Sequence, residues 1–219
     1  MDDLLKVKNG QHADSMLINP PTFIETYQTE EYDLCDALIA RLEALLNQTS
    51  KDDNIARHFM EGTETNGGAE NRKDFSFNFS VVDPDLSGQI HQLLDKFCRL
   101  YAAKYTGFSK IACISEDVKV QKTLPAGGFH NWHSETGDTA SRSNYRVLTW
   151  TLYLNDFPDG EAETEFLDQG VKLTPKKGLL CFFPAGWTHA HRGNPPYTRT
   201  KYIATGWYYY VGEEKYGQY

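Results

Sequence analysis

Residues 145–155 read YRVLTWTLYLN, a run in which β-branched, aromatic and leucine side chains fill most positions. Such a run is typical of a buried β-strand. Comparable runs occupy residues 111–123, 164–174, 178–183 and 200–211, with proline and glycine between them. Many short strands separated by turn residues favour a jelly roll, or double-stranded β-helix, in which two sheets enclose a pocket.

A helix is expected before the strands. Leucines recur at spacings of four and three at Leu34, Leu38, Leu42 and Leu45. This spacing predicts an amphipathic helix over residues 30–47, with Thr29 as its N-cap. Its apolar stripe needs a sheet or another helix to pack against.

A second helix is predicted to begin at Asp83 and Pro84, because aspartate caps a helix and proline fits its first turn. Its predicted buried residues are Leu86, Ile90, Leu93, Phe97 and Leu100. Gly107 would end it. Both helices are expected to back the sheet.

Between these helices, Phe75, Phe77 and Phe79 alternate with small polar residues, which predicts a half-buried strand. Residues 62–73 are polar and include three glycines. Because they offer little apolar area for packing, this segment is predicted to be a mobile loop that reaches over a site.

The fold class predicted is α+β, mainly β with N-terminal helices behind a jelly-roll core. With 219 residues, of which 40% are hydrophobic, the chain can bury a core in one domain. That single domain is expected to span residues 1–219. Residues 1–110 would supply the helical and strand support, and residues 111–211 the jelly-roll core.

The charge balance argues against a nucleic-acid partner. The chain has 22 Lys and Arg against 30 Asp and Glu, a net charge of -8, and its basic residues form no cluster. Binding along a phosphate backbone needs such a cluster. No nucleic acid is therefore expected among the partners, and the sequence does not indicate an oligomeric state.

The cysteines and the N-terminal residues favour a cytoplasmic protein. The cysteines lack CxxC spacing and are expected to be free thiols, as in a reducing compartment, at Cys35, Cys98, Cys113 and Cys181. The first residues lack the basic and apolar regions of a secretion signal, and no run approaches the ~18 apolar residues of a membrane span. No membrane association is expected.

Two histidine-containing segments indicate a metal site. Residues 127–135 read GGFHNWHSE, and on an extended strand His133 and Glu135 would point to the same face. A His-x-Glu pair alone is a weak signal. However, the downstream segment THAHRG offers His189 or His191 as a third ligand. Two imidazoles and one carboxylate leave three positions of an octahedron open, the arrangement of non-heme Fe(II) oxygenases.

The residues alone do not choose between the two downstream histidines. A cation ten positions past the metal histidine would lie on the next antiparallel strand and could pair with a distal carboxylate of a cosubstrate. Lys201 lies ten residues beyond His191, and Arg199 lies ten beyond His189. Both pairings remain open on this argument.

Over about residues 118–211 the chain resembles the prolyl 4-hydroxylase branch of the 2-oxoglutarate- and Fe(II)-dependent dioxygenases. The runs that carry this resemblance are RVLTWTLYLNDF from Arg146, ETEF from Glu163, TPKKGLLCFFP from Thr174 and KYIATGW from Lys201. The resemblance implies Fe(II) ligands at His133, Glu135 and His191. It also implies that Lys201 binds the C5 carboxylate of 2-oxoglutarate, with Tyr153 assisting.

Within this resemblance, His189 stays an alternative third ligand. Pro195, four residues past His191, and the KYIATGW run favour His191. The distance from Phe183 favours His189 instead. His191 is the preferred assignment.

The chain departs from the family pattern at two positions. Glu135 stands where the family usually has aspartate, and its extra methylene lets the carboxylate reach further. The tyrosine often found before the Gly-Gly turn is missing, since Leu124 and Pro125 stand close before that turn. Both departures concern contacts to the iron or the cosubstrate.

The resemblance implies hydroxylation of an unactivated C–H bond, with 2-oxoglutarate converted to succinate and carbon dioxide. Fe(II) and 2-oxoglutarate are the expected cofactor and cosubstrate, and ascorbate is a further candidate. The substrate would be a prolyl residue of a peptide or a small amino-acid-like molecule. The alternative from another class is a non-catalytic jelly-roll or cupin-like metal-binding module, which would not bind 2-oxoglutarate.

Overall fold

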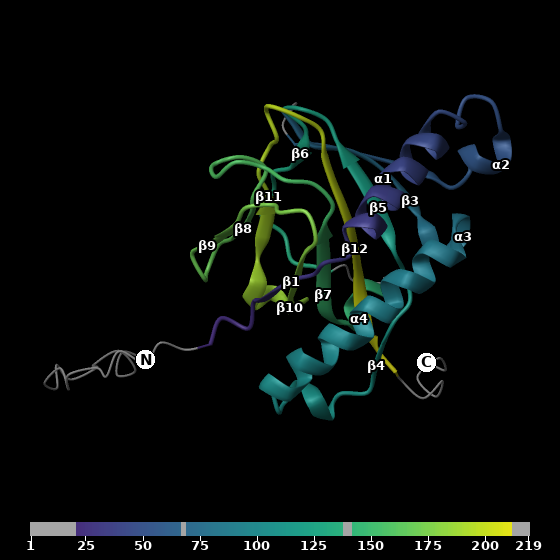
Figure 1. The fold of residues 1–219 in the computed structure, drawn as a ribbon. Coiled ribbons are helices and arrows are strands. Elements are labelled where there is room, and N and C mark those ends of the chain that lie inside the picture. Colours follow the sequence, from purple (N-terminus) through teal and green to yellow (C-terminus); the bar gives the residue numbers. More distant parts are fainter. Residues whose placement is uncertain (1–20, 67–68, 138–141, 212–219) are drawn as a thin grey trace, which may run out of the picture.

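The computed structural model describes residues 21–66, 69–137 and 142–211. Two antiparallel sheets form its core (Figure 1). The large sheet follows the order β1 (Glu25–Gln28), β10 (Leu179–Pro184), β7 (Arg146–Tyr153), β12 (Lys201–Tyr210), β5 (Lys119–Thr123), β3 (Ala69–Asn78) and β2 (Phe59–Asn66), with β4 (Cys113–Ser115) on β12 and β6 (Gly128–Phe129) on β3. The small sheet follows the order β11 (His191–Gly193), β8 (Thr164–Phe166) and β9 (Val171–Leu173).

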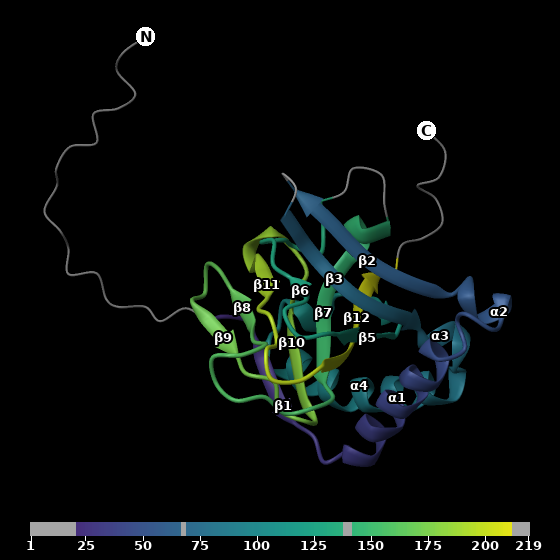
Figure 2. The ribbon, with the colours of Figure 1, turned by 90° about the horizontal axis from the view of Figure 1, so that it is seen from above.

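Two long helices cover one side of the large sheet, and the small sheet lies on the other. Figures 1 and 2 agree in placing α1 (Tyr32–Leu46) and α4 (Pro84–Lys104) away from β8, β9 and β11. This is the predicted jelly-roll core backed by helices. The short helical segments are α2 (Asp53–Ala56), α3 (Phe79–Val82), η1 (Phe108–Lys110), η2 (Arg142–Tyr145) and η3 (Trp187–His189).

The main apolar core lies between the helices and the outer face of the large sheet. The four leucines at helical spacing on α1 are all buried, as predicted. They belong to one cluster with sheet residues that include Phe77, Val120, Trp150, Leu152, Phe182 and Ala204. Each large apolar side chain buried in this way contributes about 1.5–3 kcal/mol of hydrophobic free energy. The helices are therefore held by tertiary packing.

The inner face of the large sheet is more polar and lines a cavity. Side chains on β12 alternate, so that one set packs in the outer core and the other faces inward. Ala204 and Tyr208 belong to the outer core. The inward set lines the cavity between the two sheets and consists of Lys201, Ile203, Thr205, Trp207 and Tyr209.

The predicted start of α4 is confirmed. The side chain of Asp83 accepts a hydrogen bond from the Leu86 backbone N–H, and Pro84 occupies the first turn. The prediction that Leu100 is buried is wrong, because its side chain is 51% exposed and the neighbouring Tyr101 is buried instead. The helical repeat of 3.6 residues places these adjacent positions about 100° apart.

Two further details differ from the sequence prediction. Thr29 is not the N-cap of α1, because Glu31 occupies that position and makes no side-chain capping bond. The Thr29 backbone N–H instead donates to the Gly178 carbonyl at 2.8 Å. Phe79 is buried as expected but begins α3, so the strand ends at Asn78, whose side chain caps that helix.

The prediction of a mobile loop over residues 62–73 is wrong for its described part. Within that segment, residues 62–66 continue β2 and residues 69–73 belong to β3, in one antiparallel pair. Residues 67 and 68 lie outside the described part. Backbone hydrogen bonds along the ladder hold this hairpin together, so it does not need the apolar area that its sequence lacks.

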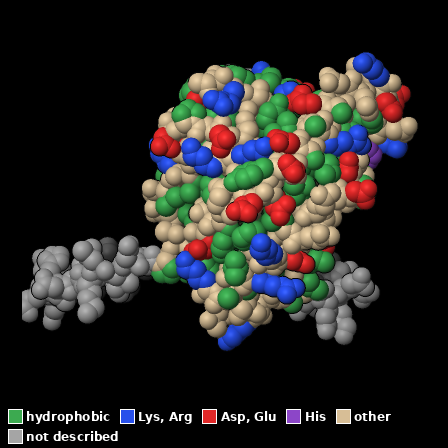
Figure 3. Space-filling view, in the orientation of Figure 1, with side chains coloured by type: hydrophobic (Ala, Val, Ile, Leu, Met, Phe, Trp, Pro, Cys, Tyr) green, Lys and Arg blue, Asp and Glu red, His purple; other side chains and the backbone are tan. Residues whose placement is uncertain are grey.

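Within the described residues, no helix is both long enough and apolar enough to cross a membrane. On the face shown in Figure 3, lysine and arginine side chains are interspersed with aspartate and glutamate. No continuous basic stripe is visible on that face, in keeping with the net charge of -8. The cysteines are free in the structure, with Cys35 and Cys181 fully buried.

Candidate metal centre

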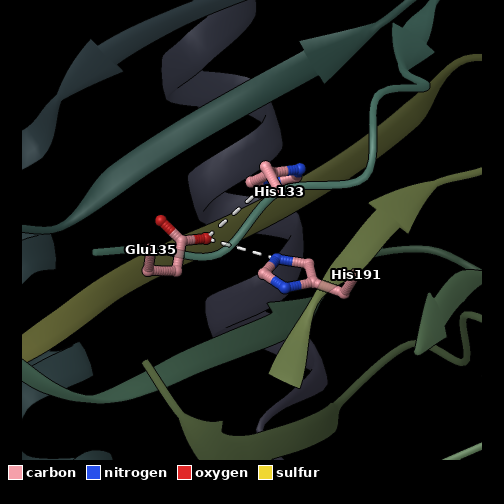
Figure 4. Close-up of side chains that lie close together, drawn as sticks. All are labelled: His133, Glu135 and His191. Carbon is pink, nitrogen blue, oxygen red and sulfur yellow. Dashed lines mark ion pairs between the residues drawn. The ribbon is translucent and has the colours of Figure 1, made fainter. Parts of the chain in front are cut away.

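The structure brings His133, Glu135 and His191 together in one cluster. One ligand atom from each lies within 4.8 Å of the other two. Glu135 Oε1 is 3.3 Å from His191 Nε2 and 3.9 Å from His133 Nε2, and all three side chains point toward one another (Figure 4). Metal bonds of about 2.1 Å put neighbouring ligands in an octahedron about 3 Å apart. The spacing suits one cation.

Backbone hydrogen bonds hold the two histidines opposite each other. His191 begins β11, and His133 forms an isolated bridge with it, with reciprocal N–H to carbonyl bonds of 3.0 and 2.9 Å. The Glu135 N–H donates to the Ala185 carbonyl at 3.0 Å. The sequence prediction of a regular strand through His133 and Glu135 is therefore wrong, although both side chains still reach the cluster.

The Gly-Gly turn before this bridge requires glycine. Gly128 has a φ of 149°, which side chains strongly disfavour. A Cβ atom there would lie 2.6 Å from the His130 ring. The His130 Nδ1 is 3.1 Å from the Gly193 carbonyl, which ties this turn to β11 and leaves His130 outside the metal cluster.

The hydrogen bonds of the histidines determine which nitrogen can bind a metal. His133 Nδ1 is 2.9 Å from the Asn131 carbonyl, and His191 Nδ1 is 3.0 Å from the His189 carbonyl. A carbonyl only accepts, so each Nδ1 must carry the proton. Each Nε2 then has a lone pair directed at the cluster, as is usual for metal-binding histidines held by a backbone carbonyl.

The electrostatics of Glu135 also fit a cation. Burial raises the pKa of Glu135, but the hydrogen bond from His191 and the positive charges of His191, His133 and Arg146 outweigh it and bring the pKa to about 2. His191 Nε2 and Glu135 Oε1 face each other at 3.3 Å, so either a proton or a cation must lie between their lone pairs. A divalent cation at this position would replace the proton and bind all three ligand atoms, namely the two imidazole Nε2 atoms and one oxygen of Glu135.

His189 lies outside the cluster although it is buried. Its Nε2 is 2.8 Å from the Thr22 carbonyl, to which it must donate, and its Nδ1 is 3.0 Å from the Thr188 hydroxyl. The η3 turn over Trp187–His189 interrupts the strand before His191. The two histidines therefore do not lie on one face of a single strand.

Lys201 lines the cavity and is buried, with only 6% of the residue exposed. Its ammonium donates to the Ala162 carbonyl at 2.6 Å. Burial lowers the pKa of Lys201 to about 8, although the charge of Glu163 opposes this shift. Lys201 begins β12, the next strand along the chain after β11, but the two strands do not pair: β12 pairs with β4, β5 and β7, whereas β11 pairs with β8.

Tyr153 is fully buried beside Lys201. Its hydroxyl donates to the Thr164 hydroxyl at 2.7 Å, and the Lys201 ammonium is 5.8 Å from its ring centroid. Thr164 lines the cavity near Lys201. The role of Tyr153 toward a cosubstrate stays a prediction, and Thr164 is a neighbouring polar group that no sequence motif marks.

The cluster and Lys201 line one cavity of about 490 Å³. Phe129 stacks on His133 at a centroid distance of 3.9 Å, and Phe183 lies edge-on to His191 at 4.8 Å. These rings supply apolar walls beside the two histidines. The remaining lining includes polar residues that the sequence analysis did not assign to the site, among them Arg146, Asn194, Gln121, Lys119, Asp117 and Asn78.

Part of the chain matches a known protein family. Residues 118–209 match the family model described as the 2OG-Fe(II) oxygenase superfamily. The match includes the cluster and Lys201. No curated protein matches the chain by sequence.

Several solved structures share the fold. A viral collagen prolyl hydroxylase from Paramecium Bursaria Chlorella virus-1 is 20% identical, with a TM-score of 0.63 over 86% of this chain and 97% of that chain. A prolyl-4-hydroxylase from Pseudomonas putida is 20% identical, with a TM-score of 0.60 over 87% and 94%. A prolyl hydroxylase from Trichoplax adhaerens, solved with a hypoxia inducible factor peptide fragment, is 17% identical, with a TM-score of 0.60 over 86% and 84%.

Proposed function

We propose that this chain, which carries a domain of the 2OG-Fe(II) oxygenase superfamily over residues 118–209, is a hydroxylase whose iron ligands are His133, Glu135 and His191. The observation that carries the proposal is the convergence of two imidazole Nε2 atoms and one carboxylate oxygen on one point. Bound Fe(II) and 2-oxoglutarate supply the oxidising power, since dioxygen and the keto acid together yield succinate, carbon dioxide and one oxygen atom for a C–H bond.

The protein's own groups position the reactants. Three protein ligands leave three octahedral positions for the cosubstrate and dioxygen. Lys201 sits in the same cavity and binds the distal carboxylate of 2-oxoglutarate, because a buried ammonium forms strong charge-assisted hydrogen bonds with an anion. The aromatic walls at Phe129 and Phe183 keep water from the reacting centre.

We also propose a substrate class, a prolyl residue of a peptide or a small amino-acid-like molecule. The support is the likeness in fold to a viral collagen prolyl hydroxylase and to a prolyl hydroxylase solved with a peptide fragment. The cavity volume of about 490 Å³ suits a cosubstrate together with one side chain or one small molecule.

The test is anaerobic addition of Fe(II) and 2-oxoglutarate to the purified protein. A visible charge-transfer band should appear, and admission of air with a candidate substrate should release succinate. Screening prolyl peptides and amino acids for a gain of one oxygen mass then identifies the substrate. A colourless mixture that releases no succinate would favour the non-catalytic metal-binding module.

The matched histidine variants test the ligand assignment. His191→Ala should abolish the band, because it removes one of three ligands. His189→Ala should keep the band, because His189 Nε2 donates to the Thr22 carbonyl and faces away from the cluster. The opposite pattern, with the band lost only in His189→Ala, would refute the assignment.

A further inference from the structure

Arg146 is bonded to the carboxylate of the metal cluster. It begins β7 and donates from Nη1 to Glu135 Oε2 at 3.2 Å and to the Glu135 carbonyl at 3.0 Å. Both side chains are largely buried, with 20% and 15% of their surface exposed. The two contacts tie the guanidinium to the side chain and the backbone of the same residue.

A second contact fixes the guanidinium in place. The guanidinium carbon of Arg146 lies 3.6 Å from the centroid of the Trp207 ring. Trp207 is on β12, which pairs with β7, so both residues are held by the same sheet. Such stacking on an aromatic face restricts the guanidinium to one plane. Arg146 therefore presents its donor from a fixed position.

The two oxygens of Glu135 have different neighbours. Oε1 faces the two histidine Nε2 atoms, at 3.3 and 3.9 Å. Oε2 faces Arg146 on the other side. A carboxylate can bind a cation through one oxygen or through both. In this arrangement only Oε1 is directed at the metal position.

Because the carboxylate ligand is a glutamate, its second oxygen has to be held away from the metal position. Compared with aspartate it has one more methylene and one more rotatable bond, so its carboxylate can turn more freely. If both oxygens bound the metal, they would occupy one of the three positions that the cosubstrate and dioxygen need. An outer contact that holds the second oxygen prevents this.

We infer that Arg146 is a positioning residue that makes Glu135 a one-oxygen ligand and so keeps three coordination positions open, an inference that rests on the proposed iron site. Arg146 acts through Glu135. In a protein with aspartate at this position, the shorter side chain would limit the carboxylate to one oxygen instead.

The test uses Mn(II) as the probe and water proton relaxation as the readout, without cosubstrate or turnover. Water molecules on the bound Mn(II) should number three in the unchanged protein. Arg146→Met keeps an unbranched side chain at this position but removes the donor and the guanidinium that stacks on Trp207, so both carboxylate oxygens should bind and displace one water. The relaxivity of the bound Mn(II) should then fall by about one third, in proportion to the three open positions.

Two further variants separate this effect from others. Arg146→Lys should recover the higher relaxivity at least in part, because an ammonium still attracts Oε2. Arg192→Met should leave it unchanged, because Arg192 pairs with Glu165 at 2.8 Å outside the cluster. Titration calorimetry on each protein checks that Mn(II) is bound.

Each outcome decides a different point. If the unchanged protein binds no Mn(II), the proposed metal site fails and this inference fails with it. If Arg146→Met binds Mn(II) with unchanged relaxivity, the metal site stands and the role of Arg146 is overturned. Loss of Mn(II) binding in Arg146→Met also overturns it, because the inference requires both Glu135 oxygens to remain available.

Discussion

The charge of the buried Lys201 ammonium changes with pH, so binding at the proposed site should change with pH as well. The pKa of Lys201 falls to about 8 because burial disfavours its charged form, and Glu163 only partly offsets this. The lysine is therefore charged below pH 8 and neutral above it. An anchor for a carboxylate must be charged to bind strongly.

The affinity for 2-oxoglutarate should consequently weaken as the pH rises past 8. We expect the dissociation constant of the anaerobic Fe(II) protein to increase by about tenfold per pH unit above that value, since binding then requires proton uptake. Titrations of the anaerobic Fe(II) protein with 2-oxoglutarate between pH 7 and pH 9 measure this dissociation constant. Lys201→Arg is the control, because a guanidinium stays charged and should give a flat profile. Parallel profiles for both proteins would contradict the anchor role.

Strand β12 can pack closely against its neighbours only because residue 206 is a glycine. Gly206 lies opposite Trp150 of β7 in the sheet. A Cβ atom at this position would contact the Asp117 carbonyl and lie 2.8 Å from Trp150. Trp150 is fully buried and cannot move aside without disturbing the core. The close approach of β12 to its neighbours therefore requires the absence of a side chain.

Gly206→Ala should destabilise the protein by about 1–3 kcal/mol or more, because it overpacks a filled core. Urea unfolding followed by tryptophan fluorescence measures the change. Gly88→Ala is the matched control, since Gly88 lies within α4 and a Cβ atom there meets nothing within 4 Å. That variant should gain about 0.5–1 kcal/mol from helix propensity. Equal stability of the two variants would contradict the packing argument.

At the scale of the whole molecule, the large sheet separates an apolar core from the cavity that contains the proposed metal site. Its outer face and the two long helices form the main hydrophobic cluster. Its inner face, with the small sheet, lines the cavity that contains the metal cluster. The helices therefore stabilise the sheet from the side opposite to the chemistry. The apolar core and the proposed site therefore use different faces of the same strands.

Leu38→Ala should lower the free energy of unfolding by about 2–5 kcal/mol, because Leu38 is fully buried between α1 and the sheet. Leu100→Ala, at an exposed position of α4, should change it by less than about 0.5 kcal/mol. Denaturant titrations of both variants provide the comparison. A Leu38→Ala protein as stable as the unchanged chain would show that α1 does not hold the sheet.

Local pattern was sufficient for most of the elements. The leucine spacing of α1 and the Asp83-Pro84 start of α4 depend on neighbours within a few residues, so the sequence predicts them. The hairpin within residues 62–73 was missed because its strands are held by backbone pairing, to which polar and glycine residues contribute as well as apolar ones. Strands held by backbone pairing do not need alternating apolar side chains, so hydrophobic periodicity does not reveal them.

The sequence by itself determined the two long helices and the strands that carry apolar runs, because apolar periodicity and capping residues act over short distances. It also marked His133, Glu135 and Lys201, whose chemical types are informative wherever they lie. Only the tertiary structure separated His189 from His191 and placed Arg146 on the second oxygen of Glu135. Those outcomes depend on turns and on contacts between strands far apart in the chain, where the direction of a lone pair decides the partner.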